Sequence, residues 1–226
     1  MICNKITHNK NKIMKKILLS FLIISTFACT NNTDNHNRSE VDYSSIGDSS
    51  SLSDLKINTQ LSNIKWIGSK VLESHDGTVN IDKGVLEIND DGELVGGEFV
   101  IDMNSLLCTD IENEKYKKKL EDHLKDEDFF DVQNFPNSAI KITDVDKVDA
   151  ESYNITAELS IKDITHSINF DANIIKQESN YEVTANFKID RTKWDVQYNS
   201  GNFFENLGDK LILDEIEFNV YLISQE

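Results

Sequence analysis

Most of the chain alternates between apolar and polar residues with a period of two. Two stretches show this most clearly, with every second residue apolar from Tyr153 to Ile161 and from Tyr181 to Ile189. Because successive side chains of a β-strand point to opposite faces, this pattern predicts strands with one buried face and one solvated face. Eight such strands are predicted, over residues 64–70, 79–88, 94–103, 139–148, 153–162, 164–175, 181–190 and 211–223.

The second of these strands changes phase along its length. Its apolar residues occupy odd positions at Val79 and Ile81 and even positions at Leu86 and Ile88. A one-residue change of phase is typical of a β-bulge, and bulges bend strands where a barrel closes. We therefore predict a bulge near Lys83. Turns are predicted at His75-Asp76-Gly77 and at Asn89-Asp90-Asp91-Gly92.

One stretch, Lys119–Pro136, interrupts the alternation. Apolar residues recur four positions apart around its start, which predicts a helix over about Glu112–Lys125. The helix is followed by the adjacent pair Phe129 and Phe130, which is flanked on both sides by aspartate. Such a pair must bury its rings while its neighbours stay in water, so we predict that this segment plugs one end of the fold.

Half-buried strands in sequential order predict an all-β domain, with the helix and the plug between the third and fourth of eight strands. Short turns between neighbours favour an antiparallel up-and-down barrel, and a two-sheet sandwich is the alternative. A barrel of about eight strands either fills its interior with side chains or holds one small ligand. The alternation is the same in both cases, and taken alone it favours a packed core.

The N-terminal residues have the features of a secretory signal. Met14-Lys15-Lys16 precede an apolar run, Ile17–Phe27, which is too short to span a membrane. Cys29 follows directly after a small residue, as in a bacterial lipoprotein signal, so we expect Cys29 to be lipidated. We predict a signal peptide over residues 1–28 with its start at Met14, and an outer-membrane lipoprotein on the periplasmic side of the envelope. Cleavage elsewhere, giving a free periplasmic protein, is the alternative.

Residues 29–56 are rich in Ser, Asn and Asp and predict a disordered tether, which leaves residues 57–226 for the barrel. The formal charge is −17, and removal of the five basic residues before Cys29 makes it about −22. An acidic protein is a poor partner for nucleic acid and for anionic membranes, so membrane attachment must come from the lipid. We expect Cys108 to be buried without a disulfide. The sequence leaves open whether the protein forms a homodimer.

No motif for catalysis is found in the sequence. The chain lacks the nucleophile, metalloprotease and phosphate-loop motifs, and the histidines of the domain, His75, His123 and His166, do not have metal-ligand spacing. We therefore predict no catalytic residue, no metal site and no cofactor. An isomerase that uses His123 or His166 is the weaker alternative.

Short motifs occur in the order found in a known family: Trp66–Lys70, His75–Gly77, Gly96–Met103, His123–Asp131, Leu159–Thr165 and Asp190–Thr192. Together they resemble the YceI-like family, bacterial secreted proteins named for polyisoprenoid binding. The resemblance spans about Asn63–Leu222 and implies a lipocalin-like barrel whose apolar lumen takes a long isoprenoid chain. Asp163 departs from the family, which often has glycine in this turn.

The resemblance implies that aromatic side chains of the barrel contact the ligand. The candidate lumen residues are Trp66, Phe99, Phe129, Phe130, Phe170, Phe187, Trp194, Phe203 and Phe218. Lys70, His123 and Arg191 are candidates for holding a polar head group, and each also fits a rim residue that pairs with carboxylates. The predicted function is a lipid-anchored protein that holds an isoprenoid lipid, either a quinone or a polyprenyl chain. A structural or partner-binding envelope lipoprotein with a filled barrel is the alternative.

Overall fold

The computed structural model describes residues 54–225. The predicted signal peptide, Cys29 and most of the predicted tether lie outside the described residues. The described chain contains one α-helix, α1 at Glu114–Lys125, and two short 3-10 helices, η1 at Arg191–Trp194 and η2 at Gly208–Lys210. Its strands are β1 (Asp54–Lys56), β2 (Asn63–Lys70), β3 (Ser74–Ile88), β4 (Leu94–Cys108), β5 (Asn137–Lys147), β6 (Ser152–Ile161), β7 (Ile164–Lys176), β8 (Tyr181–Asp190) and β9 (Ile212–Ile223).

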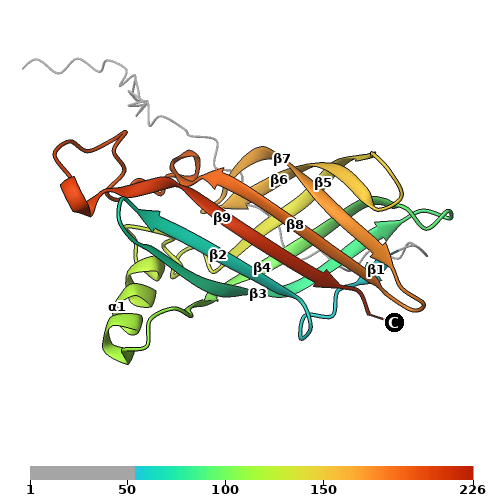
Figure 1. The fold of residues 1–226 in the computed structure, drawn as a ribbon, viewed down its shortest axis with the longest axis horizontal. Helices are drawn as coiled ribbons and strands as arrows, with labels where there is room; N and C mark the ends of the chain where they lie inside the picture. Colours follow the sequence, from blue (N-terminus) through green and yellow to red (C-terminus); the bar gives the residue numbers. More distant parts are fainter. Residues whose placement is uncertain (1–53, 226) are drawn as a thin grey trace, which may run out of the picture. The chain divides into compact units, whose positions relative to one another are not determined.

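Eight strands, β2 to β9, close into an antiparallel barrel (Figure 1). Each of them pairs with its neighbour in the chain, and β9 pairs with β2 to complete the wall. Closure provides both edges of the sheet with hydrogen-bond partners, so a second sheet is not needed to cover them. The eight-stranded barrel predicted from the sequence is confirmed, and the sandwich alternative is wrong.

The remaining strand, β1, was not predicted. It lies in the stretch assigned to the tether and pairs with the second half of β3, for example Leu55 with Leu86. The first half of β3 pairs with β2, and a bridge between Ile57 and Ser224 joins the end of β1 to β9. β1 therefore continues the wall beyond the start of β2, and the ordered domain begins earlier than the predicted Ile57.

β3 bends at the predicted bulge. Its register with β4 shifts between Ile81 and Lys83, which confirms that the change of phase in the sequence marks a bulge. Gly84 comes next, and a Cβ at this position would collide with the ring of Phe99. Glycine therefore allows Phe99 to lie against the wall. The predicted turn before β4 is confirmed, with Gly92 at a φ of 79°.

The turn predicted at His75-Asp76-Gly77 is wrong. These residues lie inside β3, paired with β2, and the chain turns at residues 71–73 instead. Gly77 has a packing role, because the backbone carbonyl oxygen of Leu107 and the indole of Trp66 lie against it and leave no room for a Cβ. A glycine required by close contacts with other strands was mistaken for a turn glycine.

Helix α1 begins close to its predicted start. The side chain of Asn113 caps it by accepting hydrogen bonds from the backbone N–H groups of Lys115 and Tyr116. α1 and the loop before β9 lie at one end of the barrel, called the α1 end below, and the β3–β4 hairpin lies at the opposite end (Figure 1). In the part of the chain that the structure describes, no helix is long and apolar enough to cross a membrane.

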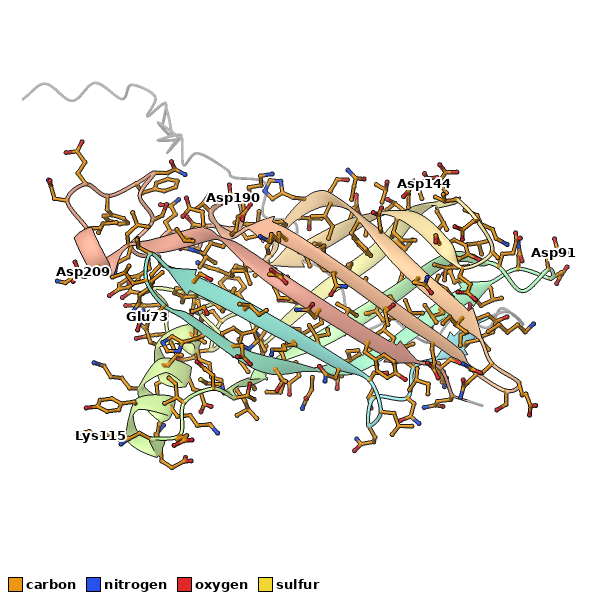
Figure 2. The ribbon with its side chains drawn as sticks, viewed as in Figure 1. Glu73, Asp91, Lys115, Asp144, Asp190 and Asp209 are labelled. Carbon is orange, nitrogen blue, oxygen red and sulfur yellow. The ribbon has the colours of Figure 1, made fainter. Side chains whose placement is uncertain are left out.

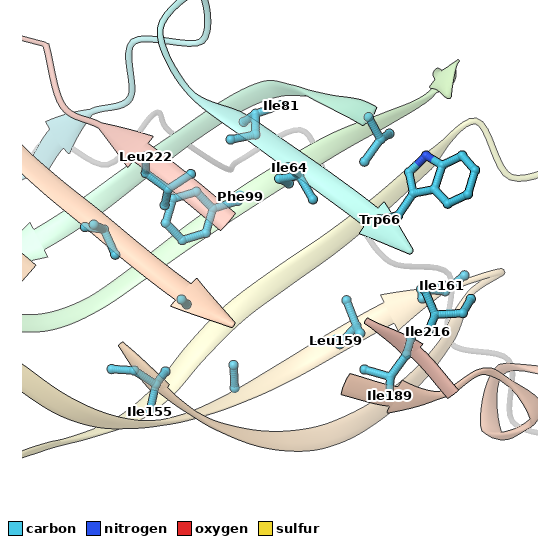
Figure 3. Packing of buried hydrophobic residues seen from close by; sticks show 14 of the residues in the cluster. Ile64, Trp66, Ile81, Phe99, Ile155, Leu159, Ile161, Ile189, Ile216 and Leu222 are labelled. Carbon is cyan, nitrogen blue, oxygen red and sulfur yellow. The ribbon is translucent and has the colours of Figure 1, made fainter. Parts of the chain in front are cut away.

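The alternation places apolar side chains inside the wall and charged ones outside. Figure 3 shows buried side chains such as Ile81 and Phe99 gathered between the strands. Figure 2 shows Asp91, Asp144 and Asp209 pointing away from the barrel. The outer surface therefore carries the acidic charge, and an apolar site has to lie inside.

Candidate functional site

The barrel encloses a cavity of about 160 Å³. Side chains from all eight barrel strands line it, together with residues of α1 and the plug. The lining residues are apolar except for Ser138 and Arg191, and the surface that faces the cavity is apolar throughout. An apolar cavity of about 150 Å³ in another protein stays dry and takes up a benzene-sized ligand. The barrel interior is therefore incompletely packed and offers an apolar binding space.

Most of the predicted lumen residues surround this cavity, namely Trp66, Phe99, Phe129, Phe130, Phe170, Phe187 and Phe218. The other two lie elsewhere. Trp194 is buried at the α1 end, where its Nε1 donates to the carbonyl oxygen of Leu159 at 3.0 Å and its ring meets that of His166. Phe203 is 50% exposed in the loop before β9. Both residues lie outside the strands, so the alternation of the sequence does not predict whether their side chains point into the barrel.

Three phenylalanines form a continuous aromatic surface along β7, β8 and β9. The ring centroids of Phe170 and Phe187 are 4.7 Å apart in a stacked arrangement, and those of Phe187 and Phe218 are 5.5 Å apart. All three line the cavity and are only partly buried. Side chains in a filled barrel would have neighbours on every side. The partial burial therefore agrees with empty space in front of these rings.

The segment after α1 packs over the cavity at the α1 end, as predicted. Phe129 and Phe130 are both buried and meet edge to face, with ring centroids 5.2 Å apart. The guanidinium of Arg191 lies 5.5 Å from the ring centroid of Phe129. Leu124, at the end of α1, lines the cavity beside them. The plug therefore forms part of the cavity wall, and the Arg191 guanidinium packs against its Phe129 ring.

Arg191 lies at this end of the cavity and is 1% exposed. Its guanidinium donates to the carbonyl oxygens of Val196, Ile212 and Leu213 and to the carboxylate of Asp214. Burial lowers the pKa of the guanidinium, against the attraction of Asp214. Since the three carbonyls come from the two ends of one loop, Arg191 fastens that loop to the barrel.

The other two predicted head-group residues do not line the cavity. Lys70 forms an ion pair of 2.6 Å with Glu73 beside the β2–β3 turn. His123 packs edge-on against Tyr198, with ring centroids 4.5 Å apart. A head-group role for either residue stays a prediction, and both have other partners in this structure.

Sequence reasoning missed Ser138, which lines the cavity from β5. It has the same inward-facing phase as Ile140 and Ile142, which also line the cavity. A serine in the apolar phase of a strand was the available signal. The prediction considered aromatic residues and passed over it.

The described residues form no candidate metal centre. Residues 54–225 contain no group of three or more His, Cys, Asp or Glu side chains placed to hold a metal ion. His75 Nδ1 is 2.9 Å from the carboxylate of Asp110, and Cys108 Sγ donates to the same carboxylate at 3.0 Å. Cys108 is fully buried, as predicted, and burial raises the pKa of its thiol. A protonated, inaccessible thiol is unsuited to nucleophilic attack.

Comparison with known proteins identifies the architecture. Residues 55–223 match the family described as the YceI-like domain. BcnA of Burkholderia cenocepacia is similar in structure, with a TM-score of 0.61 and 14% identity over 75% of this chain and 99% of that chain. A polyisoprenoid binding domain from Saccharophagus degradans, implicated in plant cell wall breakdown, gives a TM-score of 0.56 and 14% identity. The similarity covers 77% of this chain and 99% of that chain. A YceI protein of Campylobacter jejuni gives a TM-score of 0.50 and 20% identity over 63% of this chain and 80% of that chain. No curated protein matches the chain.

Proposed function

The chain belongs to the YceI-like family, and from this premise we propose that its barrel binds an isoprenoid-type lipid in the apolar cavity. The observation that carries the proposal is the closed barrel with a cavity lined by apolar side chains from every wall strand. The polyisoprenoid binding domain from Saccharophagus degradans, which has a similar fold, supports this class of ligand. The proposed role is that of a binding protein and not of an enzyme.

A hydrocarbon chain suits this cavity on energetic grounds. Its burial contributes roughly 0.8 kcal/mol per methylene and requires no hydrogen-bond partner. The free space of about 160 Å³ is smaller than a long chain needs, so side chains must move aside when such a chain enters. Phe170, Phe187 and Phe218 are suited to do this, because they face the cavity and are not fully packed. Binding should therefore combine filling of the cavity with rearrangement of these rings.

We place the entrance at the α1 end. Leu213 lines the cavity and is also 42% exposed, so the apolar lining continues to the surface at the start of β9. Lys70 at the end of β2 pairs with Ile212, so the β2–β3 hairpin lies beside the start of β9. Leu72 in this hairpin is 88% exposed. Phe203 in the preceding loop is also exposed. These side chains provide an apolar path over which a lipid could reach the lumen.

The proposed location is the periplasmic side of the envelope, with the barrel attached through a lipidated Cys29. Residues 29–53 would then serve as the tether. Several acyl chains anchor a protein firmly, whereas a surface as acidic as this one gives no attraction to anionic membranes. The variant Cys29→Ser should move the protein into the soluble envelope fraction while the barrel stays folded. If the wild-type protein carries no acyl mass and is already soluble, the anchoring proposal is wrong.

The binding proposal is tested by extraction and by stability. Native mass spectrometry of detergent-free protein should detect a co-purified lipid, and added menaquinone with a geranylgeranyl tail should raise the melting temperature. A ligand that binds only the folded state at a hundred times its Kd adds roughly 2.7 kcal/mol of stability. An empty protein whose melting temperature does not respond to isoprenoid quinones would refute the proposal and leave the filled-barrel alternative.

Gly68→Leu provides a matched control for this experiment. Gly68 lines the cavity, and a Cβ built on it has no atom within 4 Å. A leucine at this position can therefore enter the cavity without disturbing the wall. The variant should fold and lose the response to menaquinone, which separates binding in the lumen from adsorption on the exposed apolar residues.

A further inference from the structure

Two neighbouring strands of the barrel wall, β7 and β8, are paired with each other over only part of their length. The pairing joins Ala172–Lys176 to Tyr181–Ala185, next to the turn between the two strands (Figure 1). Toward the α1 end, residues 164–171 of β7 and 186–190 of β8 pair only with β6 and with β9, respectively, within the described chain. We call these two facing segments the seam. No ladder of backbone hydrogen bonds joins the wall across the seam.

The burial of the inward-facing side chains changes where the pairing ends. Ala172 and Ile174 of β7 are buried beside the paired half of β8. Ile168 and Phe170 have the same phase along β7, but they lie in the seam and are only partly buried. On β6, the other neighbour of β7, every second residue from Tyr153 to Ile161 is buried. β7 therefore lacks cover on the side of β8, where the pairing is also missing.

Side-chain contacts close the seam in place of backbone pairing. The rings of Phe170 and Phe187 stack across it, with their centroids 4.7 Å apart. Nearer the α1 end, η1 continues from β8 and meets β7 at His166. Nε2 of His166 donates to the carbonyl oxygen of Lys193 at 2.9 Å, and its ring meets that of Trp194. These few contacts are weaker than the continuous ladders on either side, so the wall separates most easily at the seam.

The seam connects the proposed entrance with the cavity. At its outer end β8 is followed by Arg191, whose Nε donates to the carbonyl oxygen of Leu213. Leu213 is the residue at which the lining of the cavity reaches the surface. At the inner end of the seam, Phe170 and Phe187 both line the cavity. A ligand that enters at the α1 end therefore meets the seam along its path.

We propose that the barrel wall parts along the seam to admit a lipid that is longer than the empty cavity. The inference rests on the proposed function and adds the movement that a free volume of about 160 Å³ requires. β7 moves away from β8, the stacked rings of Phe170 and Phe187 separate, and the lipid chain enters from the α1 end. β7 stays paired with β6 and β8 with β9, so no backbone ladder is broken.

A disulfide across the seam tests this movement. Asp171 and Asn186 come directly after the last pair of the β7–β8 ladder, and both are exposed. The stacked rings of the next residue on each strand show that the strands are close here, so Asp171→Cys with Asn186→Cys should form a disulfide. The matched control is Asn173→Cys with Thr184→Cys, because these residues already pair within the ladder. Cys108 is fully buried and does not interfere.

The readout is the association rate of menaquinone with a geranylgeranyl tail, followed by quenching of tryptophan fluorescence in the Cys29→Ser background. The oxidised seam variant should bind at least about tenfold more slowly than the oxidised control, which corresponds to a barrier raised by about 1.4 kcal/mol. Reduction of the disulfide should restore the rate. Mass spectrometry verifies the disulfide, and circular dichroism verifies that both variants are folded.

Spin labels measure the movement without a cross-link. Labels at Ser167→Cys and Lys188→Cys face each other across the seam, on exposed positions of β7 and β8. Addition of menaquinone should separate them by about 5 Å, one strand spacing, and reduce their dipolar broadening. Labels at Glu158→Cys and Ser167→Cys are the control, because these residues pair between β6 and β7. Their separation should stay the same.

The outcomes separate the inference from the function on which it rests. Failure of the wild-type protein to bind menaquinone would refute the proposed function. Equal association rates of the two oxidised variants would leave lipid binding in place and overturn the parting of the seam. An unchanged separation between the labels at Ser167→Cys and Lys188→Cys in the lipid-bound protein would overturn it as well.

Discussion

Replacement of Arg191 by methionine separates two roles for this residue, anchoring of the loop before β9 and binding of a head group. Methionine keeps most of the apolar volume and removes every donor. The carbonyl oxygens of Val196, Ile212 and Leu213 then lose their partner, and the carboxylate of Asp214 loses its cation. An unsatisfied buried acceptor costs about 1–3 kcal/mol, and removal of one partner of a buried ion pair costs about 3–5 kcal/mol. We expect Arg191→Met to lower the free energy of unfolding by about 3–5 kcal/mol.

The assay is urea unfolding of the two proteins without added lipid, followed by circular dichroism. Lys188→Met is the matched control, because it removes the same charge from an exposed ion pair with Glu215. Exposed pairs of this kind contribute about 0–1 kcal/mol. If Arg191→Met costs no more than Lys188→Met but abolishes lipid binding, then Arg191 serves the ligand and the anchoring role is wrong.

Three further changes test the cavity, the wall and the hydrogen bonds of Asp110. Phe187→Ala should cost only about 1–2 kcal/mol in denaturant unfolding, and a loss of about 3–5 kcal/mol would indicate a filled barrel. Gly77→Ala should destabilise by about 1–3 kcal/mol through collision with the backbone carbonyl oxygen of Leu107 and with the Trp66 ring, whereas Gly68→Ala, which has open space, should stay within about 0.5 kcal/mol. Burial raises the pKa of Asp110, but hydrogen bonds from Cys108 and His75 outweigh it and the net shift is downward. The contribution of this carboxylate is therefore present above its unfolded pKa of about 3.9 and lost as the pH falls through the lower folded value, so the stability difference between wild type and Asp110→Asn should shrink on acidification.

The barrel could be predicted because its main determinant repeats in every wall strand. Alternation along Tyr181–Ile189 reports an inward and an outward face without any knowledge of distant residues. The bulge in β3 could be predicted from the same alternation, because an extra residue in the strand shifts its apolar residues from odd to even positions. β1 is only three residues long, too short for alternation to show. Gly77 was misread because the groups that require a glycine there, the carbonyl oxygen of Leu107 and the ring of Trp66, lie on other strands.

The site was predictable to the extent that it follows from the phase of the strands. Phe170 and Phe218 could be placed in the lumen because they lie in strands, whereas Trp194 lies in η1 and Phe203 in the loop before β9. The role of Arg191 depends on the backbone carbonyl oxygens of Ile212 and Leu213 at the start of β9. Every residue has such a carbonyl, so the sequence does not mark these contacts.

A hollow barrel must obtain stability from places other than its centre. At about 24 cal/mol per Å³, an empty cavity of about 160 Å³ costs roughly 4 kcal/mol relative to a packed core. The α1 end offsets part of this cost with hydrogen bonds from side chains to backbone carbonyl oxygens. Arg191 holds the loop before β9, Trp194 Nε1 donates to Leu159, and Lys162 Nζ donates to the carbonyl oxygen of Asp195 at 3.0 Å. A lipid that occupies the lumen can therefore recover the free energy lost to the empty space, so the same hollow that weakens the empty barrel supplies the driving force for binding.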